Sequence, residues 1–177
     1  PWIAHALIRL FIRGFRPDMS DGRGPRPLAY ATFNEFFTRA LRPDARPAPE
    51  DAAAIACPVD GTVSMAGAID GQRLLQDQGH EYTLSALLAG LEDWVQGFAG
   101  GAFATVYLAP YNYHRIHMPL PGRLHSAWYV PGQLYHVNAT TAARVPGLFA
   151  RNERLICAFD DQAGGFAMVL VGALFVG

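Results

Sequence analysis

The sequence predicts an α+β protein in which N-terminal helices are followed by a mostly antiparallel β domain. Three observations predict this class. Residues 2–15 repeat their apolar positions at helical spacing, Thr32 and Glu35 are spaced as a helix capping box, and the chain beyond residue 51 breaks into short β-like runs separated by turn residues. With 51% hydrophobic residues, 16% charged residues and a net charge of -1, the composition is globular and lacks the basic excess of a general nucleic-acid binder.

The first expected element is an amphipathic helix over residues 2–15. One side of this helix is a basic stripe that contains His5, Arg9, Arg13 and Arg16. The far side is an apolar stripe that contains Ile3, Leu7, Leu10 and Phe11. Such a helix either packs on its own domain or lies at a membrane interface, with its arginines at anionic head groups and Trp2 in the acyl boundary. No apolar run is long enough to span a bilayer and no signal-peptide pattern is present, so any membrane contact is expected to be peripheral.

A Pro- and Gly-rich connector, residues 16–28, separates this helix from the next. The second helix is expected to start after Thr32 and to end at the Arg42-Pro43 step, with its aromatic side chains in the core. Residues 46–51 form a second linker. The predicted domains are a membrane-associating helical segment, residues 1–45, and a catalytic domain, residues 46–177, which is expected to be incomplete because the chain stops inside an apolar run.

Within the second domain, one helix is expected at residues 83–89, and residues 160–165 are expected to close a hairpin. The expected strands are residues 63–69, 103–108, 124–130, 155–159 and 166–175. Cys57 and Cys157 are too few for a disulfide framework and are expected to be buried apolar residues in a reducing compartment.

The first segment that could carry chemistry is Pro58-Val59-Asp60-Gly61, which is also a common turn sequence. The second is Tyr113-His114-Arg115-Ile116-His117, in which two histidines could divide two proton transfers or could be structural residues in an aromatic cluster. The two histidines would share a face on a helical turn and point oppositely on a strand. They lack the spacing and the glutamate of a zinc-protease helix, so no metal is expected.

The third segment is the charged run Arg151-Asn152-Glu153-Arg154. It fits a solvated turn in which Glu153 pairs with an arginine. Alternatively, Arg151 or Arg154 could bind a phosphate or a carboxylate through its planar guanidinium.

Five co-linear segments together resemble the bacterial phosphatidylserine decarboxylase family, over nearly the whole chain. They are residues 33–37 with 41–43, 58–61, 79–84 with 87–90, 113–119, and 148–154. The resemblance implies a self-cleaving proenzyme in which Asp60 and His117 form a relay with the serine of a Leu-Gly-Ser-Thr motif near the C-terminus. That motif is absent from this sequence, so this chain alone is expected to be inactive.

In this family the serine becomes a pyruvoyl group on the cleaved α chain, so no added cofactor is needed. The resemblance implies that this group forms a Schiff base with phosphatidylserine, releases CO2 and yields phosphatidylethanolamine. His114 is the candidate proton donor for that step. The implied partners are phosphatidylserine, the chain's own α chain and an anionic membrane surface at the cytoplasmic face of the cell membrane, with a homodimer as a candidate assembly.

Two other functions compete with this reading. A Ser/His/Asp hydrolase would need a Gly-x-Ser-x-Gly elbow, which the sequence lacks. A catalytically degenerate phospholipid-binding module of the same fold would keep the segments and lack the cleavage motif downstream.

Overall fold

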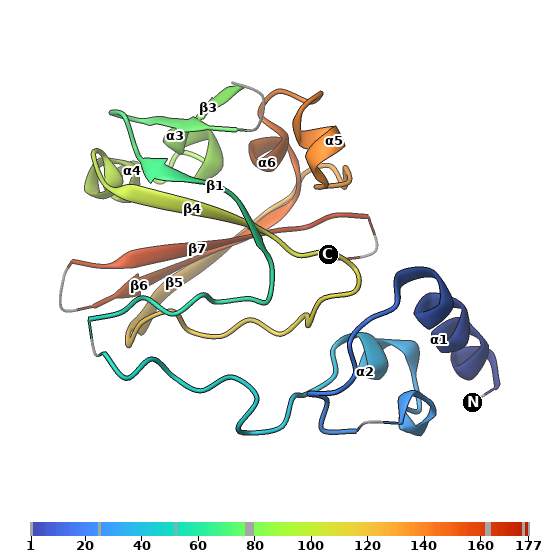
Figure 1. The fold of residues 1–177 in the computed structure, drawn as a ribbon. Helices are drawn as coiled ribbons and strands as arrows, with labels where there is room; N and C mark the ends of the chain where they lie inside the picture. Colours follow the sequence, from blue (N-terminus) through green and yellow to red (C-terminus); the bar gives the residue numbers. More distant parts are fainter. Residues whose placement is uncertain are drawn as a thin grey trace. The chain divides into compact units, whose positions relative to one another are not determined.

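A computed structural model describes residues 2–24, 26–51, 53–76, 80–161, 164–174 and 176 (Figure 1). The chain divides into two compact units, the first with Pro1–Thr62 and Leu108–Leu120, the second with Val63–Tyr107 and Pro121–Gly177. The predicted domain boundary at residues 45 and 46 therefore falls inside the first unit. The segment with both candidate histidines returns to this N-terminal unit, which also contains Asp60.

The first unit contains helix α1 (Trp2–Phe15), the 3-10 turn η1 (Pro27–Ala29) and helix α2 (Phe33–Phe37). The capping box at the start of α2 is confirmed, because Glu35 N donates to Thr32 Oγ1 over 3.1 Å and Thr32 N donates to the Glu35 carboxylate. Helix α2 ends at Phe37, earlier than predicted. Leu41 instead forms an antiparallel bridge with Gly22, because the chain turns back to pair with the connector.

An aromatic cluster joins α1 to α2. Phe11 of α1 lies 5.4 Å from Phe33, 5.8 Å from Phe36 and 5.9 Å from Phe37 between ring centroids. Phe36 and Ile8 are fully buried, which confirms the expected aromatic core. Of the predicted apolar stripe, Phe11 therefore packs inward against α2, while Ile3, Leu7 and Leu10 are exposed.

The described residues of the second unit form three small β-sheets. Strand β1 (Thr62–Ala68) pairs with β4 (Ala102–Tyr107), and β2 (Arg73–Leu75) pairs antiparallel with β3 (Glu81–Thr83). The third sheet is antiparallel and contains β5 (Arg123–Val130), β6 (Arg154–Asp160) and β7 (Phe166–Val171) in the order β5-β6-β7. Its register aligns Ala127 with Cys157 and Cys157 with Met168, after an irregularity between Leu124 and Ser126.

The described part of this unit also contains four short helices: α3 (Leu84–Leu87), α4 (Glu92–Phe98), α5 (Ala139–Ala142) and α6 (Leu148–Arg151) (Figure 1). Side chains from the strands and helices form one core, with Ile69, Leu74, Tyr82, Leu84, Leu87, Leu88, Val95 and Ile156. The α+β class with antiparallel strands behind N-terminal helices is thus confirmed.

Each expected strand is found, although β7 ends at Val171 rather than extending to residue 175, which lies outside the described residues. The hairpin between β6 and β7 is confirmed by their antiparallel pairing, while residues 162 and 163 of its turn lie outside the described part. The expectation of two buried cysteines is wrong for Cys57, which is exposed on an irregular segment. Cys157 is half-buried on β6, and burial raises the pKa of its thiol.

Candidate functional site

Two irregular segments of the first unit pair with each other and bring the candidate residues together. His117 N donates to Pro58 O over 2.8 Å, and Ala56 N donates to Pro119 O over 3.0 Å. Residues 56–58 therefore run beside residues 117–119, and the bend that carries Asp60 follows directly. The histidine segment is neither helix nor strand, so long-range backbone bonds rather than a helical or strand period orient its side chains.

The Asp60 carboxylate is held by Arg46, a linker residue that the sequence analysis did not single out. Arg46 Nε donates to both carboxylate oxygens, over 2.9 and 3.1 Å, and Nη2 donates to Oδ2. Arg46 Nη1 also donates to Asp21 over 2.9 Å. The hydrogen bonds from Arg46 lower the pKa of Asp60, with a smaller effect of the nearby His117, so Asp60 is ionised at neutral pH.

The expected relay contact between Asp60 and His117 is not among the hydrogen bonds of the described residues. His117 instead pairs through Nε2 with the hydroxyl of Tyr113, at 2.9 Å. If the phenol donates this bond, Nδ1 carries the imidazole proton, which is the tautomer that a carboxylate partner selects. Asp60 keeps free acceptor capacity, because a carboxylate offers about four lone-pair sites and Arg46 takes three.

His114 lies in a half-buried position against α2. Its imidazole stacks on the ring of Phe37, with centroids 4.0 Å apart and planes at 26°. Burial lowers the pKa of His114, against a weaker opposite effect of the Pro110 and Ala109 backbone, so the ring is neutral at pH 7. Its Nε2 is buried and has no hydrogen-bond partner among the described residues. An orphan polar atom in a folded protein is costly, and such atoms often mark functional groups.

Arg39 is a second residue that the sequence analysis missed. It is 3% exposed, its guanidinium lies 5.9 Å from the centre of the Phe36 ring, and Nη2 donates to Asp18 O. Burial lowers the pKa of Arg39, and the positive charge in turn contributes to the lowered pKa of His114. An arginine directly after an apolar helix gave no signal in the sequence, because nothing in a local pattern distinguishes a buried arginine from a solvated one.

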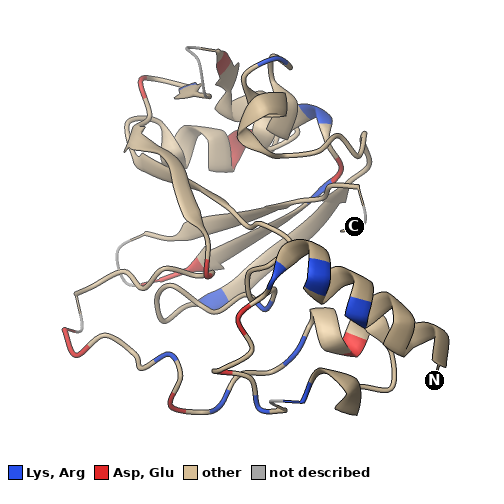
Figure 2. Ribbon diagram, turned by 45° about the vertical axis from the view of Figure 1, so that its right-hand side comes forward, with Lys and Arg blue, Asp and Glu red and all other residues tan. Residues whose placement is uncertain are grey.

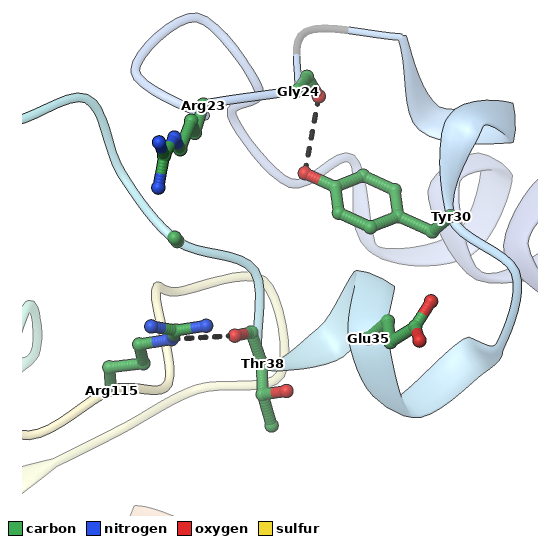
Figure 3. Close-up of a pocket in the computed structure, with 7 residues that line it drawn as sticks. Arg23, Gly24, Tyr30, Glu35, Thr38 and Arg115 are labelled. Carbon is green, nitrogen blue, oxygen red and sulfur yellow. Dashed lines mark hydrogen bonds between the residues drawn. The ribbon is translucent and has the colours of Figure 1, made fainter.

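A shallow hollow of about 410 Å³ opens beside the histidine segment (Figure 3). Its lining residues all belong to the first unit: Arg23, Gly24, Tyr30, Glu35, Thr38, Ala40 and Arg115. Arg115 is the residue after His114, and its Nε donates to Thr38 O over 2.8 Å. The hollow therefore adjoins the backbone that carries both candidate histidines.

The charged run before β6 has a structural role at Arg154. This side chain is 4% exposed and donates to four backbone carbonyls, of Ala86, Leu87, Ala150 and Asn152. The prediction that Arg154 could bind an external anion is therefore wrong, because its donors are already used inside the unit. In the same run, Glu153 accepts from the Tyr129 hydroxyl, and Arg151 donates to the Tyr135 hydroxyl.

Two features are absent from the described residues. Among them, no three His, Cys, Asp or Glu side chains gather as a metal site. None of the helices in that part of the chain combines the length and the hydropathy that a membrane span requires.

Comparison with known proteins gives a consistent set of relatives. The family model described as phosphatidylserine decarboxylase matches residues 33–177. A phosphatidylserine decarboxylase proenzyme of Bordetella pertussis is 52% identical over 176 residues, which are 99% of this chain and 59% of the relative. Proteins of the same name from Azoarcus sp. and Chromobacterium violaceum are 55% and 54% identical, over 97% and 99% of this chain and 59% and 62% of their own lengths. The chain thus spans about three fifths of the length of these relatives.

Proposed function

The chain belongs to the phosphatidylserine decarboxylase family, and we propose that it is part of a proenzyme that converts phosphatidylserine to phosphatidylethanolamine and CO2. The observation that carries the proposal is the backbone bond from His117 to Pro58, because it joins the two segments that hold Asp60 and His117. These are the residues that a relay toward a serine hydroxyl requires. The serine is proposed to lie in the part of the relatives' length that this chain does not cover.

In the proposed self-cleavage, His117 takes the proton of the serine hydroxyl, which is otherwise a weak nucleophile. Asp60 stabilises the imidazolium that forms, and it is suited to this because it is ionised at neutral pH. Arg46 orients Asp60 through its bidentate contact. Tyr113 occupies His117 Nε2 until the serine replaces it.

When formed, the pyruvoyl group supplies the electrophilic carbonyl of the decarboxylation. The buried Nε2 of His114 fits a site that serves this group, because it is shielded from water and has no described partner in the chain. We propose that His114 delivers from Nε2 the proton that replaces the lost carboxylate on the substrate α-carbon. The ring is neutral at pH 7, so Nε2 must first take up a proton, and the lowered pKa makes the imidazolium that forms a stronger acid. Its stacking on Phe37 fixes the direction of delivery.

The front segment, residues 1–45, is proposed to attach the protein peripherally to the cytoplasmic face of the membrane. Helix α1 has two apolar sides: Ile8 and Phe11 pack inward, while Leu7 and Leu10 are 48% and 69% exposed, with Trp2 and Ile3 also exposed. Arg9 and Arg13, four residues apart, add positive charge to the helix, whose basic positions are blue in Figure 2. An outward apolar stripe flanked by cations is the pattern of an interfacial helix.

The roles of the histidines are tested in full-length protein by intact mass and by CO2 release from phosphatidylserine vesicles. We expect His117→Ala and Asp60→Asn to remain uncleaved, and His114→Ala to cleave but release CO2 at least 100-fold more slowly, in the range of lost acid catalysis. His136→Ala, an exposed histidine of the second unit, is the control. Cleavage of His117→Ala together with failure of His114→Ala would reverse the roles. An uncleaved wild type that still binds vesicles would indicate the degenerate lipid-binding alternative.

Membrane attachment is tested by vesicle flotation of the double variant Leu7→Gln/Leu10→Gln. Both residues are exposed, so the fold should persist, and loss of two apolar anchors should weaken binding roughly 100-fold. Ile55→Gln, an exposed apolar residue elsewhere in the first unit, is the control. Flotation of the double variant equal to that of wild type would rule out α1 as the attachment element.

A further inference from the structure

We propose that the hollow between Arg23 and Arg115 binds the phosphate of a phospholipid headgroup, and that it is the phosphodiester subsite for the lipid substrate. This inference rests on the proposed function, because it assigns the substrate contact of the same site. It adds two residues, neither of which belongs to the Asp60 and His117 relay.

The first observation is unneutralised positive charge. Arg115 Nε donates to Thr38 O, which leaves its two terminal nitrogens available to donate to a ligand. No described residue accepts a side-chain hydrogen bond from Arg23. Neither guanidinium forms an ion pair with a carboxylate in the described part of the chain. Both residues line the hollow; Figure 3 shows the Arg115 guanidinium beside Thr38 O and the Arg23 side chain extending from the connector on the other side of the segment that follows Thr38. Two cations that line one hollow without a counter-charge favour an anion there, and the guanidinium fork suits phosphate oxygens.

The acidic residue of the lining does not cancel this charge. The Glu35 carboxylate accepts hydrogen bonds from Ala31 N, over 3.0 Å, and from Thr32 N as part of the capping box. In Figure 3 the carboxylate points away from the two arginines. The Tyr30 hydroxyl likewise donates to Gly24 O, and this bond holds one wall of the hollow in place.

The second observation is that hydrogen bonds hold in place the backbone segments that carry Arg23 and Arg115. Arg23 N donates to Ala40 O over 2.8 Å, and the neighbouring Gly22 forms a bridge with Leu41. The bond of Arg115 to Thr38 ties the histidine segment to the end of α2. A site with preset donors binds an anion without first ordering a loop.

The third observation is the position of Arg115 next to the proposed proton donor. Arg115 directly follows His114, the proposed proton donor, and Thr38 directly follows Phe37, on which the His114 ring stacks. In phosphatidylserine only a few covalent bonds separate the phosphorus from the α-carbon that loses CO2. A phosphate held at Arg115 therefore places that carbon in the neighbourhood of His114 and fixes its orientation.

The test uses the full-length, processed protein with three variants. Arg23→Gln removes a guanidinium that has no described partner, so the fold should persist, and Arg23→Lys keeps the charge without the fork. Arg26→Gln removes the same charge from the same connector, outside the hollow. For vesicles of phosphatidylcholine with phosphatidylserine, we expect Arg23→Gln to raise KM about 10-fold with kcat within about 2-fold, Arg23→Lys to recover part of this, and Arg26→Gln to resemble wild type.

Calorimetric binding of soluble probes identifies the ligand. Glycerophosphoserine should bind wild type about 10-fold more tightly than Arg23→Gln, whereas free serine should not distinguish them. Equal KM values for Arg23→Gln and Arg26→Gln would overturn the subsite. An effect of Arg23→Gln on inorganic phosphate but not on glycerophosphoserine would make it a site for free phosphate and overturn the lipid assignment. A wild type that releases no CO2 would instead refute the proposed function, while the calorimetry would still report on the hollow.

Discussion

Replacing Arg46 by glutamine removes the guanidinium that holds Asp60. The structure gives Asp60 a bidentate contact with Arg46 and gives Arg46 a second contact with Asp21. The variant should therefore lose stability, and the part of that loss that belongs to Asp60 is the measurable quantity. A double-mutant cycle of Arg46→Gln with Asp60→Asn isolates it.

The expected coupling is about 1 kcal/mol. The side chains of Arg46 and Asp60 are 41% and 29% exposed, so solvent screens the pair, and exposed ion pairs contribute at most about 1 kcal/mol. The planar bidentate geometry places this pair at the upper end of that range. A fully buried ion pair would have a coupling energy several-fold larger. Such a large coupling is not expected here, because both side chains are partly exposed.

The assay is urea unfolding of the full-length protein, in which the proposed nucleophilic serine is replaced by alanine to prevent the proposed cleavage. Since the pKa of Asp60 is lowered in the folded state, the coupling is fully present above the ordinary pKa of 3.8 and is lost as the pH falls through the folded value. We expect equal coupling at pH 7 and pH 5 and a smaller coupling at pH 3.

The control cycle pairs Asp60→Asn with Arg42→Gln, because Arg42 contacts Asp21 and does not contact Asp60 among the described residues. Its coupling should stay within about 0.3 kcal/mol of zero, the usual additivity limit. Equal coupling in the two cycles, or an Arg46 coupling that is unchanged at pH 3, would refute the assignment of Arg46 as the partner of Asp60.

Three further predictions concern stability. Because burial lowers the pKa of His114, the unfolded chain takes up a proton near pH 6.5 before the folded chain does, so the free energy of unfolding falls as the pH drops from 7 to 5. His114→Gln should flatten the dependence of this free energy on pH between 7 and 5, measured by urea denaturation. A dependence equal to that of wild type would contradict the prediction. Arg154→Met should cost about 3 kcal/mol in the same assay by leaving buried carbonyls unpaired, whereas a loss under about 1 kcal/mol would mean that water replaces the guanidinium. Phe36→Ala should cost about 3 kcal/mol through the cavity it leaves between α1 and α2, and Phe36→Leu clearly less; equal losses would argue against packing as the cause.

The sequence predicted the parts of the fold that depend on neighbouring residues. The capping box of Thr32 and Glu35 is a contact over three residues, and the periodicity of residues 2–15 is a property of one helix, so both could be recognised without a partner. The end of α2 was predicted too late, because pairing of Leu41 with Gly22 stops the helix before the Arg42-Pro43 step. Helices α4, α5 and α6 and the β2-β3 pair were not predicted, since elements of a few residues have too little periodicity to stand out.

For the candidate site, the sequence predicted Asp60, His114 and His117, because they lie in segments whose order and composition resemble one family. The contacts of those residues became visible in the folded chain: Asp60 pairs with Arg46, the His117 ring with Tyr113, and His114 with the face of Phe37. The fold also determines that Arg154 is buried among carbonyls while Arg23 and Arg115 line an open hollow. The physical reason is that an arginine has the same charge and length in every context. Whether its guanidinium meets a carboxylate, a carbonyl or solvent depends on distant segments of the chain that no local spacing specifies.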